Sequence, residues 1–225
     1  MLRLFNYLTH QKEDFNQIDK KSISIYGCGP TVYDYAHIGN FTSFIFYDQL
    51  NRTFKFLFKD LRIKFVINIT DIDDKIIAKA NDYLNSNLKA DNLLLERLDD
   101  TEKNLNSICK TITNYYTEKL FEDLNELNIS LDDYIFPRAT DYLVQMSKLI
   151  TKLDRLDLIY EVDDGLYLDV IKYNDNIAEY GRLKKNVLKL DNITRLESKQ
   201  TKHPADFAIW KFSKENEPIY TIETE

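Results

Sequence analysis

The sequence predicts an α/β fold built on a parallel β-sheet, and a pattern that occurs twice supports this. Residues 22–25 and residues 62–69 alternate apolar with polar side chains, as half-buried strands do. Each segment is followed by apolar residues at helical spacing, first over residues 41–58 and then beyond Asp71. A strand–helix–strand–helix order favours parallel strands, because each helix carries the chain back to the edge where the next strand begins.

The first strand leads into a tight turn, residues 27–30 (GCGP), which is followed by a loop and by the segment HIGN at residues 37–40. Glycine lets the backbone approach a ligand closely, and the free amides of a first helical turn favour an anion. Asn40 is well placed to cap the helix that follows. This arrangement, with the imidazole of His37 beside it, is typical of a phosphate-binding site.

The second helix is expected to start at Thr70 and Asp71. Asp73 and Asp74 then fall in its first turn, where the helix dipole favours acidic side chains. Three aspartates so close together could also suggest a metal site, but the dipole explains them more simply. Thr70 ends the second strand, where parallel sheets bind ligands, and a helix cap is an equally good interpretation of its hydroxyl.

Further elements are expected before and after this region. A hairpin among helices suggests an insertion that interrupts the parallel sheet. The expected elements are a strand at residues 2–8, mostly helix over residues 91–127, a helix starting at Thr140 or Asp141, a hairpin over residues 159–170 around an Asp-Gly turn, and a return to the core at residues 207–210.

Composition limits the class of protein. The chain has 225 residues, and 44% hydrophobic with 13% aromatic residues indicate a folded globular protein. Charged residues make up 30%, which argues against a membrane span, and the first 15 residues lack the pattern of a signal peptide. Two cysteines, Cys28 and Cys109, without a CxxC pair favour a reducing compartment, so we expect a cytoplasmic protein.

The charge balance is acidic, with a formal net charge of −7 and a pI of about 5.1. A dedicated nucleic-acid module is usually basic, so the bulk charge argues mildly against RNA binding by this chain alone. Basic residues do outnumber acidic ones over residues 181–202. That segment could contact a phosphate backbone, but a solvated loop is the simpler interpretation.

Five short sequence blocks occur in order along the chain. They are residues 28–34 (CGPTVYD), 37–40 (HIGN), 68–76 (NITDIDDKI), 137–140 (PRAT) and 206–211 (DFAIWK). Residues 37–40 are similar to the HIGH signature of class I aminoacyl-tRNA synthetases, and the other four blocks resemble those of the cysteinyl-tRNA synthetase family within that class, in the family's order. A lone HIGx would be weak evidence, whereas five ordered blocks are strong evidence.

The resemblance implies a Rossmann-like parallel sheet interrupted by a connective-peptide insertion of helices and a hairpin. On this basis we divide the chain into residues 1–95 as the first half of the catalytic domain, 96–203 as the insertion and 204–225 as a return to the catalytic core. The implied activity is the ATP-dependent activation of L-cysteine to cysteinyl-adenylate, with Mg²⁺, and its transfer to tRNA(Cys). We expect a monomer without a membrane partner.

The resemblance also implies the roles of eight residues. His37 and Asn40 would be catalytic, with His37 steadying the α-phosphate as the amino-acid carboxylate attacks it. Asn40 stands where the strict signature has a second histidine, so it can donate a hydrogen bond but carries no charge. The implied ATP contacts are Gly29, Pro30, His37, Gly39 and Asn40, the implied amino-acid contacts are Gly29, Thr31 and Thr70, and the implied zinc ligand is Cys28.

The zinc at Cys28 is implied by the resemblance, and the position and chemistry of the residue are compatible with it. A free cysteine is most often a small buried hydrophobe, but Cys28 lies between two glycines at the end of a strand, which favours a site. Zinc bound by thiolates and an imidazole can take a substrate thiol as thiolate, and it discriminates against the harder oxygen of serine.

The resemblance covers nearly the whole chain but only about the first half of the family's length. Three further zinc ligands, the KMSKS loop and the anticodon-binding region would lie beyond Glu225. Residues 211–214 (KFSK) imitate KMSKS but belong to the DFAIWK block, and His203 is expected in a loop. We therefore expect a fragment that does not aminoacylate alone. Two alternatives stay open: a cysteine ligase of this fold acting on an amino-sugar, and a non-catalytic paralogue that binds nucleotide or RNA.

Overall fold

A computed structural model describes residues 2–16, 19, 21–85, 104–183 and 200–221. The chain forms two compact units. One comprises residues 17–143 with 216–219, and the other comprises residues 1–16, 144–215 and 220–225. None of the helices in the described part of the chain combines the length and the apolar character that a membrane span requires.

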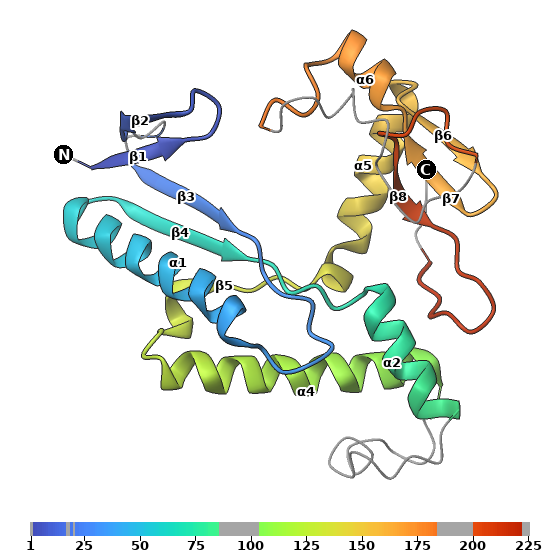
Figure 1. Cartoon of the computed structure of the whole chain (residues 1–225), viewed down its shortest axis with the longest axis horizontal. Coiled ribbons are helices and arrows are strands. Elements are labelled where there is room, and N and C mark those ends of the chain that lie inside the picture. The colour runs from blue at the N-terminus through green and yellow to red at the C-terminus, as the bar shows by residue number, and fades with distance from the viewer. Residues whose placement is uncertain (1, 17–18, 20, 86–103, 184–199, 222–225) are drawn as a thin grey trace. The chain divides into compact units, whose positions relative to one another are not determined.

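The first of these units contains the parallel sheet that the sequence predicts. Strand β3 (Ser22–Gly27) pairs with β4 (Arg62–Ile67) in parallel register, and helix α1 (Ile38–Leu57) connects them. Figure 1 shows β3 and β4 pointing in the same direction. Strand β5 (Tyr134–Ile135) adds to the other edge of β4, which gives the order β3-β4-β5, all parallel.

Helices complete this unit. Helix α2 (Asp74–Asn85) follows β4, and the long helix α4 (Leu105–Glu126) packs against it. Two short 3₁₀ turns, η2 (Leu131–Asp133) and η3 (Ala139–Tyr142), flank β5. The core joins the sheet to α4 because both elements present fully buried apolar side chains, among them Phe65, Ile67, Ile112 and Leu124.

Several element boundaries differ from the sequence-based expectation: α5 (Leu143–Arg155) begins at Leu143 rather than at Thr140 or Asp141, and the starts of α1 and α2 also differ. Helix α1 begins at Ile38 and is capped by His37, so Asn40 occupies the third helical position rather than the cap. Helix α2 begins at Asp74 instead of at Thr70 or Asp71. The reason is that residues 68–71 are held extended by neighbouring loops, with the Thr70 amide donating to the Pro30 carbonyl at 3.1 Å.

The other unit combines the N-terminal strands with most of the chain after residue 143. A short hairpin of β1 (Arg3–Asn6) and β2 (Gln11–Asp14) forms near the N-terminus. Further along lie α5 (Leu143–Arg155), β6 (Ile159–Val162), β7 (Gly165–Leu168), α6 (Val170–Asn176) and β8 (Phe207–Lys211). Strands β6 and β7 form the predicted hairpin, joined by the two-residue turn Asp163–Asp164.

Strand β8 joins the sheet that the predicted hairpin begins. It pairs antiparallel with β7, so the sheet order here is β6-β7-β8. Gly165 allows this pairing because its φ is 155° and a Cβ there would lie 2.2 Å from the Trp210 carbonyl oxygen. Lys211 closes the contact by donating to Asp164 and to the Tyr167 hydroxyl, each at 2.6 Å.

A buried carboxylate orders the loop before β8. Asp206 is fully buried and accepts hydrogen bonds from the Val170 amide, the His203 amide and the Tyr160 hydroxyl. The first residue of the DFAIWK block therefore has a structural function. His203 lies in a loop, as expected, and its Nδ1 accepts from the Ala205 amide.

Some sequence-based expectations lie outside the described residues. They are the part of the expected helix over residues 91–103 and most of the basic segment, residues 184–199. The division of the chain into residues 1–95, 96–203 and 204–225 stays a prediction.

Candidate active site

Three of the sequence blocks meet at the carboxyl ends of the parallel strands. Beyond β3 and β4 the backbone bridges continue, with Thr31 opposite Thr70 and Ile69 opposite Arg138. The Val32 amide donates to the Thr70 carbonyl at 3.2 Å, and the Ile69 amide donates to the Pro137 carbonyl at 2.8 Å. Because parallel sheets bind ligands at this edge, the convergence defines a candidate site.

Asn68 organises this edge, and the sequence analysis gave it no role. Its side-chain oxygen accepts from the Gly29 amide at 3.0 Å and from the Tyr26 hydroxyl at 2.9 Å. Its amide nitrogen donates to the Thr70 hydroxyl oxygen at 3.0 Å. A single side chain therefore fixes the glycine turn and Thr70 relative to each other. The sequence places Asn68 on the polar face of the alternating strand, near its carboxyl end, and that position was the available signal.

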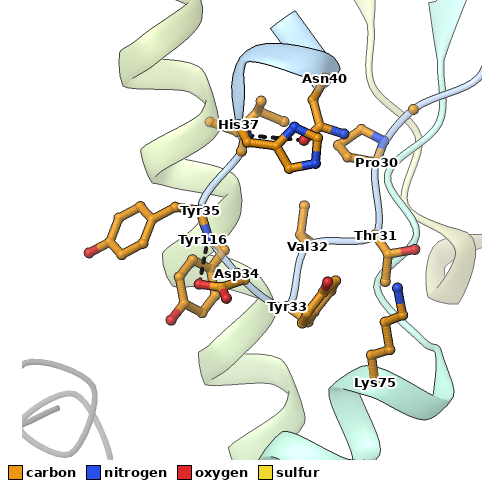
Figure 2. A pocket seen from close by; sticks show the side chains of 13 residues that line it. Pro30, Thr31, Val32, Tyr33, Asp34, Tyr35, His37, Asn40, Lys75 and Tyr116 are labelled. Carbon is orange, nitrogen blue, oxygen red and sulfur yellow. Dashed lines mark hydrogen bonds between the residues drawn. The ribbon is translucent and has the colours of Figure 1, made fainter. Parts of the chain in front are cut away.

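A pocket of about 320 Å³ opens beside these loops. Its lining comes mainly from the loop after β3 and includes Gly29, Thr31, His37 and Asn40. Figure 2 shows His37, Asn40 and Pro30 grouped on one side, with Thr31 and Lys75 on another. The predicted residues Gly29, Pro30, Thr31, His37 and Asn40 thus line one cavity, whereas Cys28, Gly39 and Thr70 do not line it.

His37 has a defined orientation. It is the N-cap of α1, and its Nδ1 accepts a hydrogen bond from the Gly39 amide at 3.1 Å. A neutral imidazole with an accepting Nδ1 carries its proton on Nε2. The ring therefore serves the helix with one nitrogen and keeps an N–H donor on the other, which is the form that can donate to an oxyanion.

Gly39 and Asn40 support this position of the ring. A Cβ on Gly39 would lie 2.9 Å from Cε1 and 3.0 Å from Nδ1 of His37, so a larger residue would displace the imidazole. The Asn40 side-chain oxygen accepts from the His37 amide at 3.0 Å and completes a capping box. An amide side chain at this position therefore has a structural task in addition to any contact with a ligand.

Gly29 is required by close packing. A Cβ at this position would lie 1.6 Å from the Asn68 carbonyl oxygen, so no other residue fits without moving the strand end. Thr31 is half-buried in the pocket, and its hydroxyl makes no hydrogen bond to the described residues. It is thus available to a ligand.

Cys28 is an exposed free thiol outside the pocket lining. Its S–H faces the Gly29 carbonyl at 3.7 Å, and the Tyr47 hydroxyl donates to the Cys28 carbonyl at 3.4 Å. An accessible thiolate fits zinc as a ligand. In the part of the chain that the structure describes, no three His, Cys, Asp or Glu side chains gather to complete a metal site.

The three aspartates of the second block have separate functions. Asp71 is buried and accepts from the Thr140 amide at 3.0 Å and the Thr140 hydroxyl at 2.5 Å, with Arg138 Nη1 3.9 Å away. It is not in the first turn of α2, contrary to expectation. Asp73 accepts from the Lys75 amide at 2.9 Å, and Asp74 is the first residue of the helix. Asp71 therefore ties the second block to the PRAT block.

Comparisons with known proteins agree with this geometry. Residues 14–223 match the catalytic domain of class I (C) tRNA synthetases. The chain belongs to this family. Among curated relatives of this class I domain, the cysteine–tRNA ligase of Finegoldia magna is 38% identical over 222 residues, and that of a Wolbachia from Culex pipiens is 39% identical over 219. The cysteine–tRNA ligase of Methanococcus vannielii is 34% identical over 222 residues.

This chain spans less than half the length of these relatives. The matches span 97%, 96% and 98% of this chain but 42%, 41% and 41% of the three relatives, respectively. Among solved structures, a Campylobacter jejuni protein named as an arginyl-tRNA synthetase matches with a TM-score of 0.52 at 15% identity, over 70% of this chain and 40% of that one. At 15% identity, this structural similarity supports the fold alone.

Proposed function

We propose that this chain is the N-terminal part of the catalytic domain of a cytoplasmic, monomeric cysteine–tRNA ligase. The whole enzyme would activate L-cysteine with ATP and Mg²⁺ to cysteinyl-adenylate and then esterify tRNA(Cys). The observation that carries the proposal is the orientation of His37, whose Nδ1 caps α1 while its Nε2–H stays available in a pocket shared with Gly29 and Thr31.

ATP would bind with its phosphates at the N-terminus of α1. The helix dipole and the Nε2–H of His37 both stabilise negative charge there. During adenylate formation the carboxylate attacks the α-phosphate, pyrophosphate leaves, and charge builds up on the phosphate oxygens. In this proposal Gly29, Pro30, Gly39 and Asn40 shape the ATP site, with Gly39 acting through the His37 ring that it makes room for.

Cysteine would bind next to the glycine turn. Thr31 offers a hydroxyl that makes no hydrogen bond to the residues described, Gly29 lies at the strand end, and the Thr70 hydroxyl is oriented by Asn68. Cys28 would supply one thiolate to a zinc ion whose other ligands the described residues do not provide. Bound zinc would select a thiolate substrate over an alcohol because sulfur is the softer ligand.

The test is an NMR titration that measures the binding of a stable adenylate analogue, cysteinyl-sulfamoyl-adenosine, to the 225-residue chain. We expect shifts of the amides around His37 and Thr31, and binding roughly tenfold weaker in His37→Ala, since a charge-assisted hydrogen bond is lost. His10→Asn is the matched control: His10 has a positive φ of 56°, which asparagine tolerates, and it lies in the N-terminal hairpin.

No binding of the analogue or of ATP by the unmodified chain would overturn the proposal. Binding of ATP alone would instead favour the non-catalytic nucleotide-binding paralogue. A full-length enzyme that forms the adenylate but charges an amino-sugar in place of tRNA(Cys) would favour the other cysteine ligase.

A further inference from the structure

Lys75 places an ammonium group in the pocket, and it is not among the residues proposed to contact ATP or cysteine. Lys75 is the second residue of α2 and lines the same cavity as His37. Its Nζ lies 5.0 Å from the centroid of the Tyr33 ring. Figure 2 shows the ammonium directed toward the side chain of Thr31.

Within the described part of the chain, the charge of Lys75 is not matched by a carboxylate. Among the described residues, none places a carboxylate oxygen within 4.0 Å of its Nζ. Asp34 is the acidic residue of the pocket lining, and it lies 3.8 Å from Lys79 Nζ instead. Lys79 also donates to the Tyr116 hydroxyl at 2.6 Å. One lysine of α2 is therefore engaged by the protein, and the other keeps its charge for the cavity.

The contact with Tyr33 orients Lys75 without using its hydrogen-bonding capacity. A cation over an aromatic face is worth about 0.5–1 kcal/mol at an exposed site, and it leaves the three N–H donors free. Lys75 is exposed, so packing does not explain why its side chain lies there. The pocket thus presents the Lys75 ammonium, the Thr31 hydroxyl and the His37 Nε2–H as donors.

We propose that Lys75 binds an anionic oxygen of the reactants that meet in this pocket. Resting on the proposed function, that oxygen belongs to the phosphate chain of ATP or to the carboxylate of the amino acid. Lys75 would then act together with His37, holding the anions from the other side of the cavity. Lysine suits this task as a compact point charge on a flexible stem.

The test compares Lys75→Met with Lys75→Arg in the 225-residue chain. Methionine keeps the length of the side chain and removes the charge, whereas arginine keeps the charge. Lys59→Met is the matched control, because Lys59 is an exposed lysine just beyond the opposite end of α1 from His37. Dissociation constants are measured by NMR titration with four probes: ATP, adenosine, cysteine and cysteamine.

We expect Lys75→Met to weaken the binding of one anionic probe roughly tenfold, with Lys75→Arg and Lys59→Met close to the unmodified chain. A loss for ATP but not adenosine identifies the phosphate. A loss for cysteine but not cysteamine identifies the carboxylate. Unchanged affinity of Lys75→Met for both anions overturns the inference while leaving the proposed function intact. If the unmodified chain binds neither ATP nor cysteine, the proposed function fails and the inference with it.

Discussion

At the scale of single residues, the first turn of α1 links a structural task to a chemical one. His37 caps the helix through Nδ1, and Gly39 leaves the space that its ring needs. The HIG sequence is thus explained by local sterics, because the glycine leaves room for an imidazole whose Nδ1 caps the helix. This reason is additional to any contact that Gly39 makes with a nucleotide.

Gly39→Ala is expected to weaken ATP binding about tenfold while changing the melting temperature little. The added Cβ displaces the ring, so the hydrogen bond to a phosphate is lost. Alanine gains about 1 kcal/mol in helix propensity over glycine, which roughly offsets the weakened cap. ATP titration and thermal unfolding of the same sample separate the two effects. An unchanged affinity for ATP would mean that the ring orientation does not matter for binding.

At the scale of elements, Asp71 connects β4 to the turn that follows β5. Both of its oxygens are used by Thr140, and Arg138 lies nearby. Since these contacts join segments almost seventy residues apart, they hold together the loops that form the site. The sequence pattern D-x-D-D does not predict this function, because no local feature distinguishes the buried Asp71 from the two aspartates that follow.

Asp71→Asn is expected to lower the free energy of unfolding by about 1–3 kcal/mol, because a buried charge-assisted hydrogen bond is replaced by a poorer one. Asp74→Asn is the control and should cost less than about 1 kcal/mol, since it removes only a helix-dipole interaction. Urea unfolding measures both. A double-mutant cycle with Thr140→Val should give a coupling energy of about 0.5–3 kcal/mol, and additive effects would argue against the pairing.

At the scale of the whole molecule, buried weak acids make the fold sensitive to alkaline pH. Burial raises the pKa of the Cys109 thiol to about 11. Burial also raises the pKa of Tyr134, and burial together with the hydrogen bond to Asp206 raises that of Tyr160. In each case the folded chain holds a proton that the unfolded chain releases at lower pH.

The free energy of unfolding should therefore be constant up to about pH 9 and fall as the pH rises toward 11 and beyond. The reason is that these groups ionise first in the unfolded state, which lowers the free energy of that state relative to the folded one. Urea midpoints between pH 8 and pH 11 check this. Cys109→Val removes one of the three groups, so its decline should be shallower. A midpoint that rises with pH would contradict the sign of all three shifts.

The extent of the chain leads to a prediction about activity. It spans about 41% of the length of its curated relatives, and one zinc ligand is expected within it. We therefore expect no cysteine-dependent ATP–pyrophosphate exchange from the 225-residue chain alone, although it binds ATP. Measurable exchange, abolished by His37→Ala, would show that this part of the domain is sufficient for adenylate formation.

The sequence alone determined the parallel α/β class, the β6–β7 hairpin and the residues around the glycine turn. These features depend on local signals, namely alternation of apolar residues, helical spacing, an Asp-Gly turn and a glycine pair. Such signals can be recognised in the sequence without knowing which distant residues the segment contacts. The family resemblance rested on the same contiguous blocks. Each such feature is set by neighbours within a few positions along the chain.

Only the tertiary structure decided the start of α2, the pairing of β8 with β7, and the tasks of Asn68, Asp71 and Lys75. In each case the deciding contact joins residues that are far apart in the chain, such as Asp71 with Thr140 or Gly29 with Asn68. Whether an aspartate faces a helix dipole or a distant threonine depends on how the strands are packed. Side-chain direction at the edge of a sheet is a property of the assembled fold, because it is set by which loops lie next to each other.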